Sequence, residues 1–382
     1  MLRQISLKNV LSYKNLPDFE LRSLNVLIGA NGSGKSNFLE VLGLLRAAPR
    51  DLASALRQGG GLEEWRWKGL PRGPVYIRTT FDDPGGPLRY TLVLREDAKI
   101  EERLTRPDES DPNEFHTYFS ARISQRGSRL LLGEKSLRRL KPEDLDPEQS
   151  LLSQIRDPGR YPEITRVARL LDRICLYREW TMGASSASRR APAVDLAQDM
   201  LREDVLNLPL VLHRLQTDNH ARSIETYLAK LLPDFRRLVI RIEGSRARLF
   251  LDEGPHEELT PASRLSDGTL RFLFLMTVLC DPSPPPLVGI DEPELGLHPE
   301  AVQLVAQALK QAASRTQLVV TTHSEALVDE LSDVPESVVI CEREPDGSSQ
   351  LRRLSRSKLK LWLADYRLGE LWRKGEIGGT LW

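Results

Sequence analysis

The sequence predicts an α/β protein whose core is a parallel sheet wrapped by helices, with a flanking antiparallel sheet and an inserted helical lobe. A glycine-rich loop separates a strand-like run from a helix-like run at residues 24–46. A second apolar run, at residues 287–293, ends in two carboxylates. Strand-like and helix-like segments then alternate to residue 341, which is typical of a parallel sheet because each crossover between parallel strands needs a long connection.

The glycine-rich loop at residues 29–36 has the form G-x-x-x-x-G-K-S. The apolar run 24–28 predicts a buried strand before it, and the apolar spacing of residues 35–46 predicts a helix after it. In that setting backbone N–H groups and the helix N-terminus can surround phosphate oxygens. We expect Lys35 to neutralise the β and γ phosphates and to act in catalysis, and Ser36 to bind Mg²⁺ through its hydroxyl. The expected phosphate-binding residues are Gly29, Asn31, Gly32, Ser33, Gly34, Lys35, Ser36 and Asn37.

The two carboxylates at the end of the run 287–293 complete the expected site. The run has the Walker B form, an apolar strand followed by Asp291 and Glu292. We expect Asp291 to hold Mg²⁺ through water. Glu292 is the expected catalytic residue, because hydrolysis of a phosphoanhydride needs a positioned water more than covalent chemistry.

The N-terminal third predicts the antiparallel sheet. Residues 1–7 alternate in polarity like a strand. Residues 75–81 and 89–95 are strand-like and are joined by the turn-rich segment 82–87. Together with the phosphate loop and its helix, they form a predicted first part of the ATPase-like head, residues 1–100.

The middle of the chain, residues 101–235, is predicted to be an inserted, mainly helical lobe. Residues 164–171 and 205–215 have helical apolar spacing, although Pro209 should kink or restart the second helix. The small, polar and basic stretch 183–192 predicts a mobile loop. No heptad pattern persists over three or four heptads, so long coiled-coil arms are not expected.

Residues 236–382 form the predicted second part of the head. Residues 238–242 and 248–251 predict a pair of strands around a Gly-Ser turn. An apolar helix at 270–280 precedes the Walker B strand, and a helix at 300–313 follows it. Further strands are expected at 318–321 and 337–341.

Two further motifs indicate the class of ATPase. Residues 265–269, Leu-Ser-Asp-Gly-Thr, resemble the signature motif of ABC-type ATPases, usually Leu-Ser-Gly-Gly-Gln. His323 ends the run Val-Val-Thr-Thr-His and resembles the ABC switch histidine, a third expected catalytic residue. The order of the four motifs and their spacing also resemble that family. The changed positions Asp267 and Thr269, the run Gly-Leu-His-Pro at 296–299 and the C-terminal run 371–379 resemble the SMC/RecF-like branch, in stand-alone "AAA family ATPases" related to the ATPase part of OLD-family proteins.

The resemblance implies a mechanism and several partners. In ABC-type ATPases two copies close around ATP, so Ser266 and Gly268 would contact the nucleotide held by a partner copy. It implies a homodimer through ATP, the cofactors ATP and Mg²⁺, and control of DNA or of a separately encoded effector in DNA repair or anti-phage defence. A RecF-like DNA-binding recombination loader is the alternative, and a transporter nucleotide-binding subunit fits less well because of the long insertion and the altered signature.

Other features of the resemblance are missing or open. Only 41 residues, 342–382, follow the last expected core strand, which is too short for the Toprim nuclease domain of OLD-family proteins. The Q-loop glutamine is not identified; Gln125 and Gln154 are candidates, and each is more simply explained as an ordinary polar residue.

Composition limits the possible partners. The formal net charge is +0, so no overall charge favours nucleic acid. Basic residues still cluster around Arg138 and Arg139, around Arg236 and Arg237, and along 352–360, where phosphate binding and a solvated surface are both possible. The three cysteines form no metal motif, and their odd number favours a reducing cytoplasm. The longest apolar run, 272–280, is too short to span a bilayer.

Overall fold

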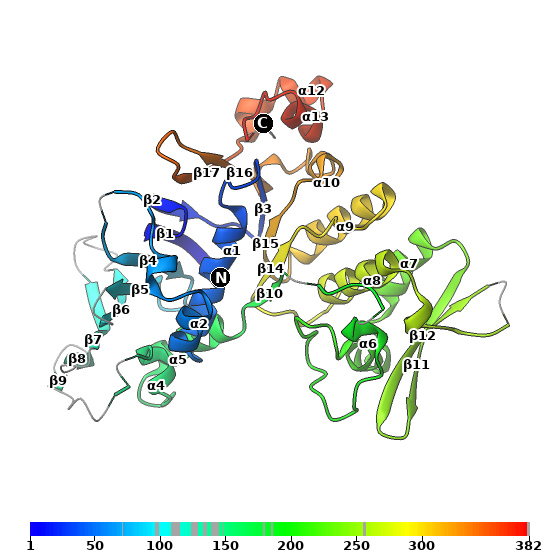
Figure 1. Ribbon diagram of the computed structural model, residues 1–382, viewed down its shortest axis with the longest axis horizontal. Helices are drawn as coiled ribbons and strands as arrows, with labels where there is room; N and C mark the ends of the chain where they lie inside the picture. Colours follow the sequence, from blue (N-terminus) through cyan, green and yellow to red (C-terminus); the bar gives the residue numbers. More distant parts are fainter. Residues whose placement is uncertain are drawn as a thin grey trace.

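The computed structural model describes residues 1–70, 72–95, 99–107, 115–123, 129–132, 136–138, 145–146, 148–178, 180–184, 186–254 and 257–379. Three sheets lie in a row across the molecule (Figure 1). We call the eight-stranded sheet at the left of the figure sheet A, the six-stranded sheet in the centre sheet B and the three-stranded sheet at the right sheet C. The predicted α/β class is confirmed, because sheet B is parallel in all but one pairing and is wrapped by helices.

Sheet B carries the predicted motifs on adjacent strands. Its order is β10–β14–β15–β3–β16–β17, and only β17 is antiparallel to its neighbour. Carboxyl ends of parallel strands meet at one edge of a sheet, so the segments that follow β3, β14 and β15 are neighbours in space. The strands are β10 (Cys175–Tyr177), β14 (Leu287–Asp291), β15 (Gln317–Thr321), β3 (Leu24–Ile28), β16 (Val338–Arg343) and β17 (Ser349–Arg353).

Both faces of sheet B are buried, which explains its continuous apolar strands. Along β3, Val26 packs into a core with α8 (Asp267–Leu279), α9 (Pro299–Ala312) and α10 (Glu325–Asp329), whereas Leu27 packs into a second core on the opposite face. That second core contains α1 (Lys35–Ala47) and the inner face of sheet A.

Sheet A is antiparallel and larger than expected, with the order β2–β1–β4–β5–β6–β7–β8–β9. Side chains on one face alternate with those on the other, and along β5 every second residue is buried. The strands are β1 (Leu2–Val10), β2 (Tyr13–Glu20), β4 (Val75–Phe81), β5 (Leu88–Arg95), β6 (Lys99–Pro107), β7 (Phe115–Ile123), β8 (Arg129–Leu132) and β9 (Ser136–Arg138). The short helices α2 (Leu52–Gln58) and α3 (Leu62–Trp65) lie between β3 and β4 in the chain.

The start of the predicted inserted lobe is not helical. The expected boundary at residue 100 falls inside β6, and the chain continues sheet A through β9. Strand β6 pairs with the free edge of β5 and so extends an existing sheet. The polar composition of this segment does not predict such pairing, because strand formation here depends on the neighbouring strand. Helices begin only at α4 (Leu151–Gln154) and α5 (Pro162–Asp172), which pack into the core shared with α1, and β10 then joins sheet B.

The remainder of the middle segment packs on the opposite side of sheet B. Helix α6 (Leu208–Thr217) begins at Leu208 with Pro209 in its first turn. Of the two effects predicted for this proline, a kink or a new helix start, the structure shows the helix start. Helix α7 (Arg222–Leu231) follows, and both helices contact α8. Sheet C, made of β11 (Phe235–Glu243), β12 (Arg246–Glu253) and β13 (Thr260–Pro261), confirms the predicted strand pair. The C-terminal helices α11 (Arg356–Leu359), α12 (Trp362–Asp365) and α13 (Leu368–Arg373) lie at the top of Figure 1.

Candidate functional site

The phosphate loop lies between the carboxyl end of β3 and the N-terminus of α1. Gly29 and Gly34 have φ values of 153° and 106°, in the region that favours glycine. A Cβ atom on Gly29 would collide with the carbonyl oxygen of Cys341, and one on Gly34 would collide with the hydroxyl of Ser349. The backbone of this loop therefore requires glycine at both positions, which is why the motif was readable in the sequence.

Lys35 is held inside the loop. Its Nζ donates to the carbonyl oxygens of Gly29 at 2.7 Å and Ala30 at 3.0 Å, and only 5% of the residue is exposed. Burial lowers the pKa of Lys35, although the carboxylates of Glu292 and Asp291 oppose that shift. The hydroxyl of Ser33 is buried and has no hydrogen-bond partner among the residues that the structure describes. A buried ammonium and an unpartnered hydroxyl in one loop fit a phosphate-bearing ligand.

The Walker B carboxylates lie at the same edge of sheet B. The Oδ1 atom of Asp291 accepts a hydrogen bond from the hydroxyl of Thr321, on the neighbouring strand β15. Glu292 Oε1 lies 3.6 Å from His323 Nε2. Burial, followed by the positive charge of Lys35, lowers the pKa of His323, so its imidazole is neutral at pH 7. The structure thus brings Lys35, Asp291, Glu292 and His323 together from three adjacent strands.

Glu292 has a strained backbone that is fixed by its neighbours. Its φ of 47° lies in the left-handed region, which is uncommon for a residue other than glycine. The N–H of Glu292 donates to the carbonyl oxygen of Thr321 at 3.1 Å. Its own carbonyl oxygen accepts from Arg271 Nη2 at 3.3 Å. Strain of this kind is maintained where the surrounding structure determines the conformation, and it turns the carboxylate toward His323.

Two residues of the site were missed by the sequence analysis. Glu294 Oε1 accepts a hydrogen bond from the backbone N–H of His323 at 2.7 Å, and burial raises the pKa of Glu294. Arg271 is 9% exposed, stacks over the ring of Trp180 at 4.8 Å and reaches Glu292 from the signature helix. The sequence offered one signal, a third carboxylate two residues after Glu292; the position of Arg271 depends on how α8 packs.

The signature motif forms the N-terminus of α8. The hydroxyl of Ser266 accepts from the backbone N–H of Thr269 at 3.0 Å, as an N-cap does. A Cβ atom on Gly268 would lie 3.0 Å from the carbonyl oxygen of Gly296, so glycine permits close packing of α8 against the segment after Walker B. In the described part of the chain, no hydrogen bond or ion pair links Ser266 or Gly268 to Lys35, Asp291 or His323.

Two residues of the predicted basic clusters, Arg237 and Arg353, are bonded away from this edge. Arg237 pairs with Asp252 at 3.0 Å on sheet C. Arg353 donates to three oxygen atoms, including the side chain of Asn25. The side chain of Arg138, and Arg139 and Gln125 entirely, lie outside the described residues. The side chain of Gln154 bonds within its own segment, to the carbonyl oxygen of Asp146, so neither candidate is identified as the Q-loop glutamine.

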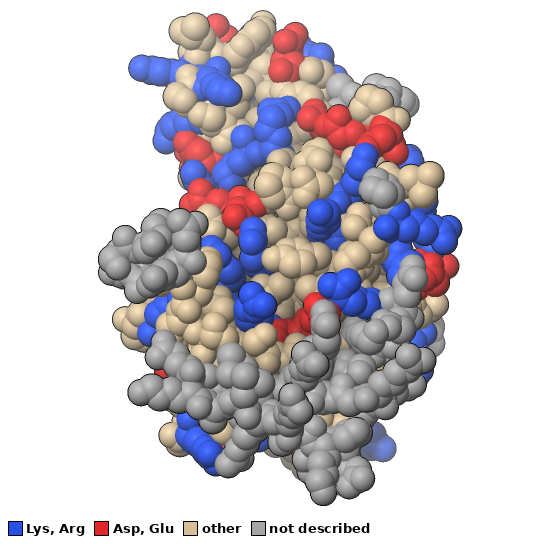
Figure 2. Space-filling model, turned by 90° about the vertical axis from the view of Figure 1, so that its left-hand side faces the viewer, with Lys and Arg blue, Asp and Glu red and all other residues tan. Residues whose placement is uncertain are grey.

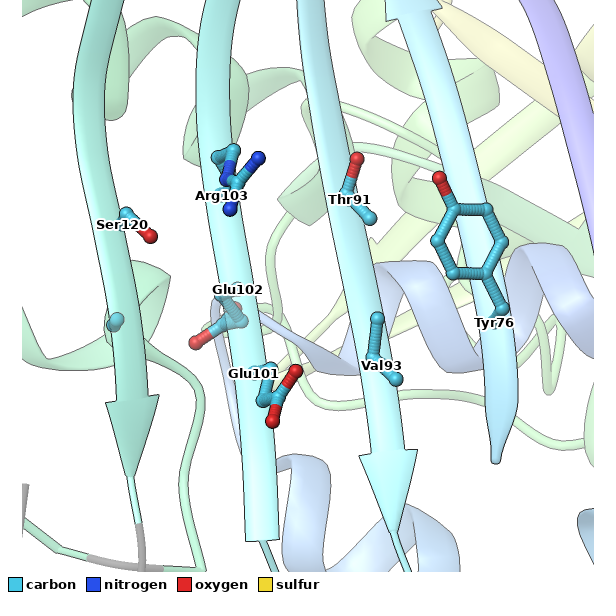
Figure 3. A pocket seen from close by; sticks show the side chains of 8 residues that line it. Tyr76, Thr91, Val93, Glu101, Glu102, Arg103 and Ser120 are labelled. Carbon is cyan, nitrogen blue, oxygen red and sulfur yellow. The ribbon is translucent and has the colours of Figure 1, made fainter. Parts of the chain in front are cut away.

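A separate hollow of about 430 Å³ lies on sheet A and away from the phosphate loop (Figure 3). Tyr76, Thr91 and Arg103 point into it from adjacent strands, whereas Glu102 points to the opposite face of the sheet (Figure 3). On this side of the molecule, Lys and Arg side chains lie around a largely uncharged centre, with groups of Asp and Glu side chains between them (Figure 2). The hollow lacks phosphate-loop residues and is therefore not the nucleotide site.

The fold and the site define a protein of the AAA-type ATPase class, with the phosphate-loop motif, the carboxylates Asp291 and Glu292 and the imidazole of His323 at one edge of a parallel sheet. The chain belongs to the family described as "AAA domain, putative AbiEii toxin, Type IV TA system", which matches residues 24–329. No curated protein matches it.

Solved structures confirm the fold class. An SMC head bound to the C-terminal winged-helix domain of ScpA is similar, with 17% identity, a TM-score of 0.53, and 94% of this chain and 99% of that chain covered. An SMC head with an extended coiled coil, bound to the C-terminal domain of ScpA from Pyrococcus furiosus, has 14% identity and a TM-score of 0.52 over 95% of this chain and 98% of that chain. Within the described residues, no helix has the length and apolar character needed to cross a membrane.

Proposed function

We propose that the chain hydrolyses ATP, closes with a second copy around the nucleotide, and uses this cycle to control DNA or a separately encoded effector. The observation that carries the proposal is the convergence of four groups at one edge of sheet B: the buried Lys35, Asp291 with its Thr321 partner, Glu292 and the neutral His323. Phosphoryl transfer to water depends mainly on positioning and on charge stabilisation, and these groups can supply both.

The residues present fit a nucleotide with Mg²⁺. Among the residues that the structure describes, no cluster of three or more His, Cys, Asp or Glu side chains could hold a metal alone. Mg²⁺ usually takes one or two protein oxygens and completes its shell with phosphates and water. Ser36 and Asp291 would hold the ion, which when bound neutralises charge on the phosphate oxygens.

The side chains of this chain then have separate roles. Lys35 and the loop N–H groups bind and orient phosphate oxygens. Glu292 orients the attacking water and takes up its proton, while His323, 3.6 Å away, fixes the direction of that carboxylate. Among the described residues, no hydrogen bond joins Ser266 or Gly268 to the phosphate loop of their own chain, and their place at the N-terminus of α8 supports an action on a partner's nucleotide.

A Glu292→Gln variant tests the cycle. The amide keeps the size of the side chain but cannot accept a proton, so we expect hydrolysis to fall by about 100-fold or more while ATP binding survives. Light scattering should show a dimer that forms with ATP and persists, whereas the wild-type dimer should dissociate after turnover. Lys35→Ala is the control that should remain monomeric. Wild-type turnover in Glu292→Gln would contradict the role of Glu292.

The outer face of sheet A supports nucleic acid as a partner. One row of side chains crosses five strands, since Ser6, Arg78, Thr91, Arg103 and Ser120 are paired in register. The adjacent row runs through Lys8, Tyr76, Val93 and Glu101, and the carboxylate of Glu101 pairs with Arg95. Arg103 and Lys8 have no polar partner among the described residues, and the two rows border the hollow in Figure 3. Free cations on a broad sheet face can neutralise backbone phosphates.

Charge reversal tests this partner. We expect Arg103→Glu together with Lys8→Glu to weaken duplex DNA binding and to reduce its dependence on salt. Arg236→Glu with Arg237→Glu tests the cluster expected from the sequence, in which Arg237 already has an acidic partner. If neither pair of changes alters binding, or if duplex binding is absent at low salt with ATP, the partner is a protein effector.

A further inference from the structure

Two residues of the stretch that composition predicts to be a loose loop, Gly183 and Arg189, are bonded to the signature motif and the turn before it. The backbone N–H of Gly183 lies 3.1 Å from both carboxylate oxygens of Asp267. The hydroxyls of Ser186 and Ser188 are buried and lie 2.7 Å apart. These bonds argue against the expected mobile loop at Gly183, Ser186 and Ser188.

Arg189 makes the most extensive contact with the signature turn. Its guanidinium is only 12% exposed, and it forms an ion pair with Asp267. The same side chain donates to the backbone of the turn that precedes α8. The acceptors of Nη1 are the carbonyl oxygens of Leu265 at 2.7 Å, Ser263 at 3.1 Å and Ala262 at 3.3 Å.

These bonds explain why the turn has one defined shape. Residues Ala262–Arg264 form a single 3₁₀ turn, which leaves its last carbonyl groups without helical partners. An arginine offers several donors in a rigid plane, so one side chain can satisfy several of them at once. The other side of the turn is fixed by Ser266, whose hydroxyl caps α8.

Asp267 therefore has a structural reason to replace the usual signature glycine. It is the first residue of α8, where a carboxylate is favoured by the helix dipole. The Arg189 guanidinium, and next the Gly183 N–H, lower the pKa of Asp267 and keep it ionised. The departure from the family pattern is thus one half of a contact whose other half comes from the middle segment.

We propose that Arg189 is the positioning residue that holds the signature turn in the shape that completes the nucleotide site of a second copy of this chain. The proposal rests on the ATP-closed dimer proposed above. It implies that Arg189 acts in trans: its loss damages the site whose phosphate loop belongs to the partner copy, and leaves the phosphate loop of its own copy intact.

The test compares Arg189→Ala with mixtures of variants. Alone, Arg189→Ala should bind ATP with wild-type affinity, while turnover at saturating ATP falls on the order of 100-fold because of lost positioning. The turnover of Arg189→Lys should lie between those of wild type and Arg189→Ala, because an ammonium can pair with Asp267 but cannot also donate to three carbonyl groups. Arg222→Ala, an exposed arginine at the start of α7 rather than on the signature turn, should keep wild-type turnover.

Mixing separates action in trans from general damage. An equal mixture of Arg189→Ala and Lys35→Ala places one intact composite site in each mixed dimer, so turnover should recover to about a quarter of the wild-type rate if sites act independently. A mixture of Arg189→Ala with Ser266→Arg should stay inactive, because neither copy then offers an intact signature.

The outcomes distinguish this proposal from the proposed function. Wild-type turnover of Arg189→Ala would overturn the role of Arg189. The same conclusion would follow if the mixture of Arg189→Ala with Lys35→Ala stayed inactive while the mixture of Ser266→Arg with Lys35→Ala recovered turnover. Full activity of Ser266→Arg alone, or no recovery in its mixture with Lys35→Ala, would overturn the composite site itself. If Arg189→Ala melts early, Asp267→Asn removes the ion pair with a smaller change and carries the same test.

Discussion

Two carboxylates have different sets of hydrogen-bond partners: the buried Glu102 of sheet A and the half-buried Glu294, which follows the Walker B strand. Glu102 is 2% exposed, and both of its oxygens are bonded. Its Oε1 accepts from the hydroxyls of Tyr90 and, at 2.6 Å, Ser150, and its Oε2 accepts from the backbone N–H of Leu151 at 2.6 Å. This carboxylate joins sheet A to α4 and has no unused acceptor facing a cavity.

Glu294 has an incomplete set of partners by comparison. Within the described residues, one oxygen accepts from the backbone N–H of His323 at 2.7 Å, and the other is buried without a hydrogen bond of normal geometry. The hydroxyl of Thr322 lies close enough to this carboxylate to lower its pKa in part, against the effect of burial. An unpaired buried oxygen costs free energy, so it persists where function requires it or where a ligand or water completes it. In this protein the fully bonded Glu102 lies at a structural junction, whereas the incompletely bonded Glu294 lies in the candidate site.

The largest expected effect is at the phosphate loop. Lys35→Ala should abolish ATP binding, because the loop loses its main counter-charge for the phosphates. Isothermal titration with ATP and Mg²⁺ measures this, with Lys230→Ala on an exposed part of α7 as the matched control. Near-wild-type affinity in Lys35→Ala would move the nucleotide site away from sheet B.

The next largest effect is expected at Glu294, the carboxylate that lies in the candidate site. Glu294→Gln should lower turnover about tenfold, because a neutral amide removes a charge beside Lys35, Glu292 and His323. Its melting temperature should change little, since the unpaired oxygen has no hydrogen bond to lose. A large drop in melting temperature with normal turnover would reverse the assignment and make Glu294 structural.

Glu102→Gln, the corresponding change in sheet A, should lower the stability of the protein and leave its turnover unchanged. In Glu102→Gln one acceptor oxygen becomes an NH₂ donor, so at least one of the donors on Tyr90, Ser150 and Leu151 loses its acceptor. We expect the free energy of unfolding to fall by about 1–3 kcal/mol. Turnover of the folded enzyme at low temperature should match wild type. Chemical denaturation followed by ATPase assays on the same samples checks both, and reduced turnover without destabilisation would break the contrast.

The smallest effect is the pH dependence of stability. Burial raises the folded-state pKa of Glu102 above its ordinary value of 4.5, despite the three donors. The stabilisation that this shift represents is complete below pH 4.5, where both states are protonated, and is lost as the pH rises through the folded-state pKa. Wild type should therefore lose stability relative to Glu102→Gln between pH 4.5 and that value. Identical pH slopes in thermal melts of the two proteins would show that Glu102 has no raised pKa.

Much of the site was predictable because it depends on local sequence. The loop at 29–36 needs glycine where φ is positive, and buried parallel strands need continuous apolar residues, so the loop and strands β3, β14 and β15 were all recognisable. The parallel arrangement then predicts that the strand ends, and with them Lys35, Asp291, Glu292 and His323, meet at one edge.

What the sequence by itself determined was therefore the α/β class, the order of the motifs and the chemical type of each site residue, because periodicity and turn chemistry are properties of neighbouring residues. Only the tertiary structure decided that β6 to β9 extend sheet A, that Arg271 and Glu294 support Glu292 and His323, and that Arg189 binds the signature turn. Each of these contacts joins residues from different elements, and Arg189 lies 78 positions from Asp267. No local pattern encodes such a pairing, since it exists only once both segments have packed against the same core.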